Sequence, residues 1–206
     1  MSESAAYEAN APLRAFISID LPSDARIALA EIQTELSRRA TATGLGRAVR
    51  WTRPESIHLT LKFLGDTPAD LVPRLGDRLR GGLARACVLS LRLSTLGVFP
   101  NARAPRVIWV GLAGDLASLD QLQRSVEDAV SPLGFPAERR PFSPHLTLGR
   151  VVEAASPRSR EELGRLVLEA SPPAAVEFVV GEVSLMRSEL TCGGAIYSRL
   201  DSFTLS

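Results

Sequence analysis

The chain has 206 residues, of which 45% are hydrophobic and 23% are charged, and its formal net charge is +1. The apolar fraction excludes an intrinsically disordered chain, and the balanced charge excludes a general polyanion binder, so any contact with nucleic acid is expected to be local. We therefore expect a soluble globular protein whose length suits one large domain or two small lobes that share a core.

The first residues and the two cysteines carry no targeting or metal signal. Residues 1–12 lack a basic leader and an apolar run, and no stretch of the chain reaches bilayer-spanning length. We expect a disordered tail, a single domain over residues 13–206, a cytoplasmic location and no membrane association. Cys87 and Cys192 stand alone, without the paired spacing of a zinc or redox motif, which is typical of reduced thiols.

From residue 13 onwards, strand and helix patterns follow one another along the chain. Strands are predicted where apolar residues alternate or run continuously, and helices where they recur every three or four residues. The predicted order is a strand at 13–19, a helix from 23 to about 43, a strand at 57–64, a helix between 68 and 81, strands at 88–96 and 106–112, a helix at 116–130, a strand at 145–152, a polar connection at 154–160, a helix at 161–170, and strands at 176–186 and 196–205. The order nearly repeats in the two halves, which suggests two similar lobes in which the second strands are equivalent.

The only two histidines open the same tetrapeptide, His-Leu-Thr-Leu, at 58–61 and 145–148. Because side chains alternate across a strand, His58 and Thr60 project from one face and their leucines from the other, and His145 and Thr147 do the same. One such strand would be an ordinary amphipathic strand, but two in the same frame indicate a site. If the lobes are related by a pseudo-twofold axis, the polar faces meet across a cleft around one small ligand.

Two imidazoles and two hydroxyls suit phosphodiester hydrolysis. One imidazole can take a proton from attacking water while the other protonates the departing alkoxide, and histidine titrates in the right pH range for both tasks. The hydroxyls of Thr60 and Thr147 can donate to nonbridging phosphate oxygens and hold the phosphorus between the imidazoles. The arrangement needs no metal or other cofactor, and the sequence offers neither a third histidine nor a helical metal motif for a catalytic zinc.

The paired motifs, within 57–65 and 144–150, resemble those of the two-histidine phosphoesterase superfamily, and more specifically those of the RNA 2',3'-cyclic phosphodiesterases, also called 2'-5' RNA ligase-like proteins. The likeness extends through 14–22, 97–100 and 106–111 to the strand at Ile196-Tyr197. It implies a bilobal α+β fold, with an antiparallel sheet in each of two pseudo-symmetric lobes, a central cleft between them and the helices outside.

The same resemblance implies an activity. Enzymes of this family open a terminal RNA 2',3'-cyclic phosphate to a 2'-phosphomonoester and can run a related 2'-5' ligation in reverse. By this resemblance His58 donates a proton to the leaving oxygen and His145 accepts one from water. The nearly symmetric sequence itself leaves the two roles open.

Three further residues are candidate substrate contacts. Lys62 lies four residues after His58 and is expected on the same face, whereas the second strand has Gly149 there. A bulge at Gly149 would swing Arg150 into the cleft, where its guanidinium can pair with phosphate. Phe16 could stack on a base. The alternatives are a solvated side chain for Lys62, a surface salt bridge for Arg150 and core packing for Phe16.

The sequence thus predicts a monomeric, metal-independent phosphodiesterase whose partners are RNA ends or nucleotides that bear a 2',3'-cyclic phosphate. Arg50 and Arg53 flank the first motif strand, where they either steer an RNA tail or lie on a solvated strand edge. Two other functions use the same cleft. One is a noncatalytic module that binds a nucleotide or an RNA end, and the other is an enzyme that acts on ADP-ribose or tRNA-splicing cyclic phosphates.

Overall fold

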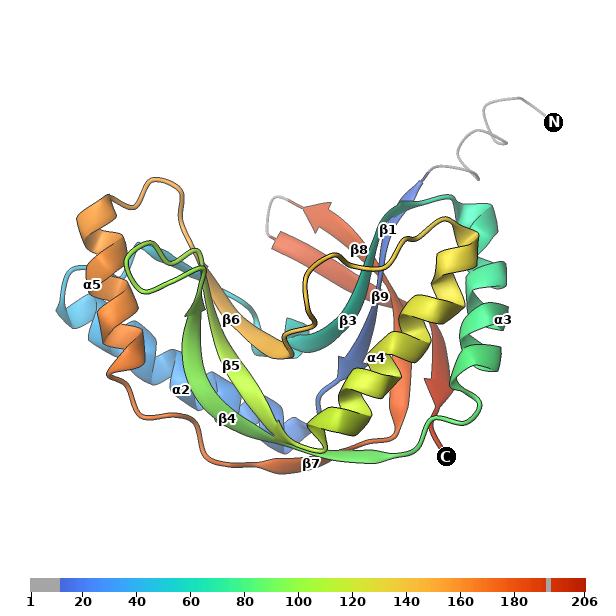
Figure 1. The fold of residues 1–206 in the computed structure, drawn as a ribbon. Helices are drawn as coiled ribbons and strands as arrows, with labels where there is room; N and C mark the ends of the chain where they lie inside the picture. The colour runs from blue at the N-terminus through green and yellow to red at the C-terminus, as the bar shows by residue number, and fades with distance from the viewer. Residues whose placement is uncertain (1–11, 192–193) are drawn as a thin grey trace.

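The computed structural model of the chain describes residues 12–191 and 194–206 (Figure 1). Apart from Pro12, the predicted tail lies outside the described residues, as does Cys192. The described elements are β1 (Leu13–Asp20), α2 (Ser23–Ala42), β2 (Val49–Trp51), β3 (His58–Thr67), α3 (Val72–Leu83), β4 (Leu89–Phe99), β5 (Val107–Gly114), α4 (Leu116–Val130), β6 (His145–Val151), α5 (Pro157–Leu168), β7 (Glu177–Val180), β8 (Glu182–Thr191) and β9 (Gly194–Thr204). Short 3-10 helices lie at Pro54–Ser56, Ala69–Leu71 and Ser131–Leu133.

The described strands form one curled antiparallel sheet. Its order is β7-β4-β5-β6-β3-β1-β8-β9, and β2 pairs with β6 beside this path. The two motif strands, β3 and β6, join the halves of the sheet through an antiparallel pair in which Leu59 lies opposite Leu146. The α+β class with antiparallel strands is confirmed, and the two expected sheets are the two halves of a single one. We call these halves, with the helices that cover them, the β1–β3 lobe and the β5–β6 lobe.

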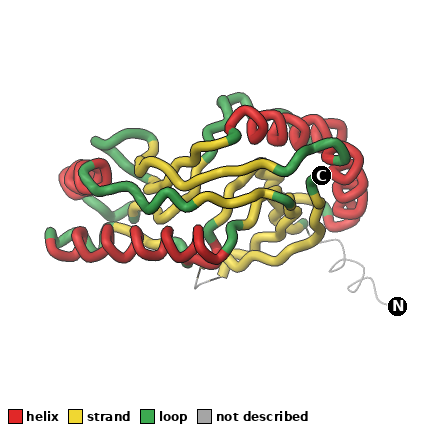
Figure 2. Tube along the Cα trace, turned by 90° about the horizontal axis from the view of Figure 1, so that it is seen from below, coloured by secondary structure: helices red, strands yellow, loops and turns green. Residues whose placement is uncertain are grey.

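The α-helices lie outside the curled sheet, at its two ends (Figures 1 and 2). Helices α3 and α4 pack together over the β1–β3 lobe, where α4 contacts β3 and α3 contacts β9. Helices α2 and α5 pack together over the β5–β6 lobe, where α5 contacts β4. Helix α2 follows β1 in sequence and α4 follows β5, so one helix of each half of the chain covers the sheet of the other half. The repeat in the sequence therefore does not correspond to the lobes in space.

The strand predicted at 176–186 is wrong, because the chain leaves one end of the sheet and enters the other end within this segment. Strand β7 pairs with β4, whereas β8 pairs with β1 and β9. Only Gly181 separates the two strands, and its carbonyl accepts the backbone N–H of Leu205 at 2.8 Å. Both pieces are rich in residues that favour strands, and such a composition says nothing about which neighbour a strand pairs with.

Several boundaries also differ from the sequence prediction, and one strand was missed. Helix α5 begins at Pro157 rather than at 161, because the Ser156 hydroxyl accepts the backbone N–H of Ser159 at 3.1 Å and Pro157 takes the first helical position. The predicted polar connection is therefore partly helical. Strand β2, which has only three residues, was not predicted at all. It pairs with β6 through Val49 to Trp51.

The core lies between the sheet and the helices, and the motif leucines point into it. Leu59, Leu61, Leu146 and Leu148 are at most 3% exposed. The histidines and threonines between them are half-buried. The two faces that the motif predicts are therefore confirmed.

Both motif strands carry a β-bulge at the same position. The register of β1 with β3 jumps from Ser18–Thr60 to Ile17–Lys62, and the register of β5 with β6 jumps from Trp109–Thr147 to Ile108–Gly149. The bulged residues are therefore the second leucines of the two motifs, and each bulge reverses the alternation of faces after it. The predicted bulge next to Gly149 is confirmed, and an equivalent bulge precedes Lys62.

A buried glutamine from the helix that covers each lobe reaches each bulge. The side-chain amide of Gln33 on α2 donates to the carbonyls of Leu148 and Thr52, both at 2.7 Å. That of Gln123 on α4 donates to the carbonyl of Leu61 at 3.5 Å. Because buried carbonyls need donors, the two glutamines stabilise the bulged backbone and attach each helix to the opposite half of the chain.

We predict that Gln33→Leu lowers the free energy of unfolding by about 1–3 kcal/mol, because the Thr52 carbonyl loses its donor and the Leu148 carbonyl loses one of two. Urea unfolding measures the loss. Gln121→Leu is the control, since Gln121 lies on the exposed side of α4 and its replacement should change stability by less than about 0.5 kcal/mol. Equal losses in the two variants would contradict a role for the Gln33 amide.

Candidate active site

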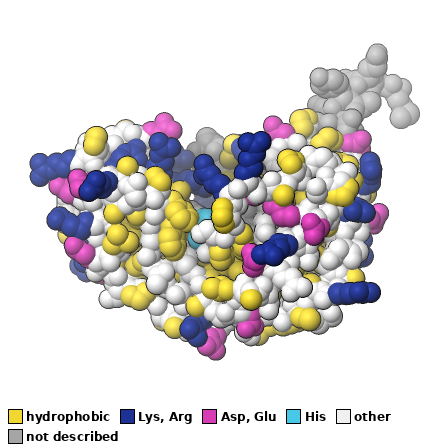
Figure 3. Space-filling view, in the orientation of Figure 1, with side chains coloured by type: hydrophobic (Ala, Val, Ile, Leu, Met, Phe, Trp, Pro, Cys, Tyr) yellow, Lys and Arg dark blue, Asp and Glu magenta, His cyan; other side chains and the backbone are white. Residues whose placement is uncertain are grey.

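The pairing of β3 with β6 places the four motif side chains on one face of the sheet. Leu59 lies opposite Leu146. Continuing this antiparallel register by one residue in each direction sets His58 opposite Thr147 and Thr60 opposite His145. Residues opposite one another project from the same face. The two motifs therefore meet as neighbouring strands of one sheet, rather than across a gap between separate sheets, and Figure 3 shows a histidine within the hollow between the lobes.

The two imidazoles are oriented by the same device. Nδ1 of His58 lies 2.8 Å from the carbonyl of Ser56, and Nδ1 of His145 lies 2.7 Å from the carbonyl of Ser143. A carbonyl only accepts, so each Nδ1 carries the hydrogen and each Nε2 is left for proton transfer. The repeat thus begins two residues earlier than the tetrapeptide, as Ser-x-His-Leu-Thr-Leu. The two serines were not among the predicted site residues, although their shared position before each histidine is visible in the sequence.

Two aromatic rings enclose His58. Phe16 of β1 stacks on the imidazole with ring centroids 4.8 Å apart, and Tyr197 of β9 meets it edge-on at 5.1 Å. Burial lowers the pKa of His58, against the opposing effects of the Ser56 carbonyl and the Asp20 charge. The neutral form of His58 is therefore favoured in the free protein more than in an exposed histidine.

Phe16 does not lie where a base could stack on it. The side chain is 3% exposed and one of its faces is covered by His58. Phe16 packs instead against the imidazole and supports it. This position is closer to the alternative of core packing than to the predicted contact with a base. Even-numbered residues of β1 face the site, as a base contact by Phe16 would need. The sequence alone did not show that the His58 imidazole would cover the face of the Phe16 ring.

Lys62 also differs from the expectation, because it does not share a face with His58. Its side chain is 3% exposed, and Nζ lies 2.8 Å from the carboxylate of Glu127 on α4 and also donates to the carbonyl of Pro136. The bulge at Leu61 is the physical reason, since it turns Lys62 toward the helix and leaves Phe63 exposed. Lys62 therefore forms a buried ion pair and is not placed to reach a ligand at His58.

His145 has its own aromatic wall. Phe99 meets the imidazole edge-on with centroids 5.0 Å apart, and Trp109 lies at 6.4 Å. Trp109 packs directly on Gly97, where an added Cβ atom would overlap the indole ring. The segment from Gly97 to Phe99, noted in the sequence as part of the resemblance, thus builds one side of the site. The role of Trp109 was not predicted.

Arg150 follows the second bulge and is exposed. It lies opposite Arg50 of β2 and Val107 of β5, and its neighbour Val151 is buried. The ion pairs found among the described residues do not include Arg150. Glycine is required just before it, because a Cβ on Gly149 would lie 2.9 Å from Cγ1 of Val49.

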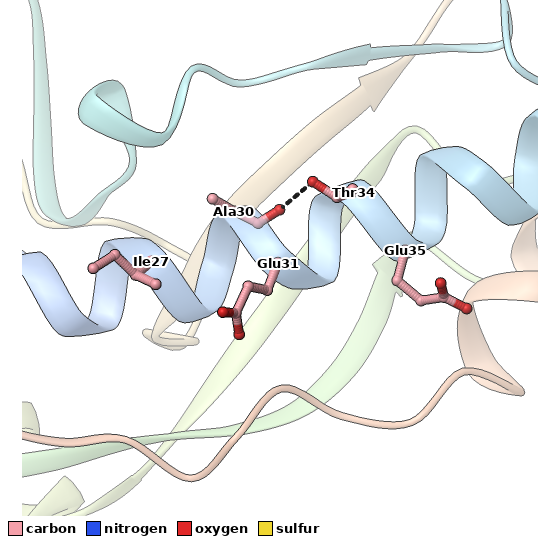
Figure 4. Close-up of a pocket in the computed structure, with 5 residues that line it drawn as sticks. All are labelled: Ile27, Ala30, Glu31, Thr34 and Glu35. Atoms are coloured by element: carbon pink, nitrogen blue, oxygen red, sulfur yellow. Dashed lines mark hydrogen bonds between the residues drawn. The ribbon is translucent and has the colours of Figure 1, made fainter.

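A metal site, a membrane span or a second binding site would each need further features among the described residues. No group of three His, Cys, Asp or Glu side chains among them is arranged to hold a metal ion. None of their helices has the length and apolarity that crossing a membrane requires. A hollow along α2 is lined by Ile27, Ala30, Glu31, Thr34 and Glu35 of that helix alone, and the Thr34 hydroxyl is already bonded to the Ala30 carbonyl (Figure 4).

A family model described as the 2'-5' RNA ligase superfamily matches residues 21–191. The chain belongs to this superfamily. It is 36% identical over 193 residues to a protein of Methanothermobacter thermautotrophicus named RNA 2',3'-cyclic phosphodiesterase, covering 94% of this chain and 99% of the relative. The resemblance stated from the paired motifs is confirmed.

Solved structures agree with this assignment. The protein TT0787 of Thermus thermophilus matches with a TM-score of 0.76 and 28% identity, over 94% of this chain and 98% of that one. E. coli LigT, in a complex with 3'-AMP, matches with a TM-score of 0.69 and 27% identity, over 95% of this chain and 99% of that one. The bilobal two-histidine phosphoesterase fold is therefore confirmed for this superfamily member.

We predict that Tyr197→Leu raises the pKa of His58 toward the ordinary histidine value, because loss of the ring admits water to the buried imidazole and desolvation is the largest cause of the lowered pKa. An NMR titration of the imidazole resonances measures the change. Phe99→Leu, which alters the wall of His145, is the matched control and should leave the His58 titration unchanged. An unchanged His58 pKa in Tyr197→Leu would contradict the prediction.

Proposed function

We propose that the chain is an RNA 2',3'-cyclic phosphodiesterase that opens a terminal 2',3'-cyclic phosphate to a 2'-phosphomonoester, with His58 and His145 as its proton-transferring residues. The observation that carries the proposal is the pair of imidazoles on neighbouring strands, each with Nδ1 bonded to a serine carbonyl and each opposite a threonine in the continued register. The names of the relatives support the same substrate class.

In the proposed reaction the phosphorus lies between the two Nε2 atoms. One imidazole takes a proton from water as the water oxygen bonds to phosphorus. The other gives its proton to the 3'-oxygen as the bond from phosphorus to that oxygen breaks, which leaves a 2'-phosphate and a free 3'-hydroxyl. Thr60 and Thr147 donate to the nonbridging oxygens, and Arg150 pairs with the negative charge that they carry.

The resemblance assigns proton donation to His58 and proton acceptance to His145, and we adopt these roles. Burial of His58 opposes donation in the free protein because it favours the neutral imidazole. The negative charge of a bound cyclic phosphate acts in the opposite direction, since a nearby anion favours the protonated form. The same proton transfers, with the 5'-hydroxyl of a second RNA end in place of water, would form a bond from that oxygen to phosphorus as the bond to the 3'-oxygen breaks, which joins the ends through a 2'-5' linkage, the ligation that the superfamily is named for.

The proposal also includes a monomeric protein in the cytoplasm. Its substrates there are the cyclic-phosphate ends of cleaved RNA. Comparison of RNA ends with ADP-ribose and tRNA-splicing cyclic phosphates, in the presence of chelator, tests the substrate class. Tight binding of a cyclic-phosphate RNA by the wild-type chain, with no product after long incubation, would show that the chain is a noncatalytic binding module and not an enzyme.

We predict that the leaving group distinguishes the two histidines. His58→Ala and His145→Ala should each slow opening of the cyclic phosphate by about 10²–10⁴-fold. A nucleoside phosphodiester with 4-nitrophenolate as leaving group needs no proton donor, so His58→Ala should recover most of its rate on this substrate while His145→Ala does not. If the rate recovered in His145→Ala instead, His145 would be the proton donor and His58 the proton acceptor. Wild-type rates in the double variant would exclude the two-histidine mechanism.

The pH dependence of kcat/KM gives a further prediction. Activity requires one neutral and one protonated imidazole, so the acidic limb reports the lower of the two apparent pKa values of the pair. Burial lowers the pKa of His58, and therefore activity should persist below the ordinary value of about 6.5 and fall only at more acidic pH. In Tyr197→Leu the acidic limb should move to higher pH. A limb at or above the ordinary value in the wild-type chain contradicts this prediction.

A further inference from the structure

A hollow of about 340 Å³ opens beside His58 and away from the second motif strand. Its walls come from β1, the start of α2, the segment before β3, and strands β8 and β9. The lining residues are Ser18, Asp20, Arg26, Arg53, Glu55, Ser56, Ile57, His58, Met186, Ala195, Ile196, Tyr197 and Arg199. His58 thus belongs both to this hollow and to the pair of imidazoles described above.

Two buried donors at the wall of the hollow have no acceptor among the described residues. They are the hydroxyl of Ser18, whose residue is 1% exposed, and Nε of Arg26. Burial of a donor without an acceptor is unfavourable, and such groups in a folded protein call for an explanation. Since both donors belong to residues that line the same hollow, the explanation that the structure favours is an acceptor that enters it.

The charges around the hollow favour an anion. Three arginines line it against two carboxylates, Asp20 and Glu55. The charge of Asp20 is already paired, because its Oδ2 accepts Arg199 at 2.6 Å and the Ser184 hydroxyl at 3.3 Å. Arg26 and Arg53 form no ion pair among the described residues, so they remain to meet an incoming negative charge.

We propose that this hollow binds the phosphate on the 5' side of the terminal nucleotide, the group that links it to the preceding nucleotide of an RNA strand. The proposal rests on the proposed function, which places the cyclic phosphate at His58 and His145. The phosphate one nucleotide away is the next anion along the strand. Ser18 and Arg26 donate to its nonbridging oxygens, and Arg53 lies at the rim, where the sequence allowed a role in steering an RNA tail.

A nucleobase fits the hollow less well. A base presents donors as well as acceptors at its edge, and Oδ2 of Asp20, one of the acceptors that would receive those donors, is held by Arg199 and Ser184. The unsatisfied Nε of Arg26 only donates and the Ser18 hydroxyl can donate, whereas phosphate oxygens only accept. The site is therefore expected to favour oligonucleotide or 5'-phosphorylated substrates over a cyclic nucleotide with a free 5'-hydroxyl, whichever base is present.

The test compares ligands that differ only in the 5'-phosphate. Binding of a nucleoside 2',5'-bisphosphate and of the corresponding 2'-monophosphate is measured by calorimetry, and kcat/KM is measured for the 5'-phosphorylated and unphosphorylated 2',3'-cyclic nucleotides. We expect the 5'-phosphate to improve binding and kcat/KM by about ten- to a hundredfold in the wild-type chain, as charge-assisted hydrogen bonds do. In Arg26→Met most of this preference should disappear.

Two further variants keep the test decisive. Ser18→Ala removes only the hydroxyl and should reduce the preference by a few-fold, which tests the hollow even if Arg26→Met fails to fold. Arg38→Met is the matched control on the same helix. The Arg38 side chain is 69% exposed and pairs with Glu35, and neither residue lines the hollow. This variant should leave the preference at its wild-type value.

The outcomes separate this proposal from the proposed function. Equal binding of the two nucleotides in the wild-type chain, or a preference that survives Arg26→Met and Ser18→Ala, overturns the phosphate site while leaving the phosphodiesterase intact. A different result would also overturn the phosphate site: the 5'-phosphate has no effect, but the chain prefers one base and Arg26→Met removes that preference. The hollow would then bind a base. Absence of turnover overturns the proposed function, and calorimetry still measures whether the hollow binds the 5'-phosphate.

Discussion

The pairing of β3 with β6 at Leu59 and Leu146 is the constraint on which the rest of the site depends. It brings together two motifs whose histidines are 145 − 58 = 87 residues apart in sequence. The same pairing sends the motif leucines into the core and the histidines and threonines to the inner face. A backbone pair between two strands of one sheet thus sets the relation between the two imidazoles.

The bulges that follow this pair let two strands with the same motif perform different tasks. After the bulge, β3 uses Lys62 for an ion pair beneath α4, while β6 has Gly149 because β2 passes too close for any side chain. The walls around the histidines also differ, with Phe16 and Tyr197 on one side and Phe99 and Trp109 on the other. An almost symmetric backbone therefore gives the two imidazoles unequal environments.

Sequence reasoning predicted what depends on local periodicity. The alternation in His-Leu-Thr-Leu was enough to give the faces of His58 and His145, and most helices and strands followed from their apolar spacing. It was wrong for Lys62, because a bulge shifts the alternation and its position depends on the neighbouring strand. It also missed the crossing at Gly181 and the aromatic walls, since these depend on contacts between distant elements. The serines before the histidines were detectable, but their carbonyl bonds were not.

The exchange of α2 and α4 between the lobes makes the two halves of the chain interdependent. Gln33 and Gln123 each reach a bulge in the half that does not contain them. A protein split in the connection between β4 and β5 would carry His58 on one fragment and His145 on the other, and each fragment would lack the helix whose glutamine bonds to its own motif strand. We therefore expect turnover only when the two fragments reassemble.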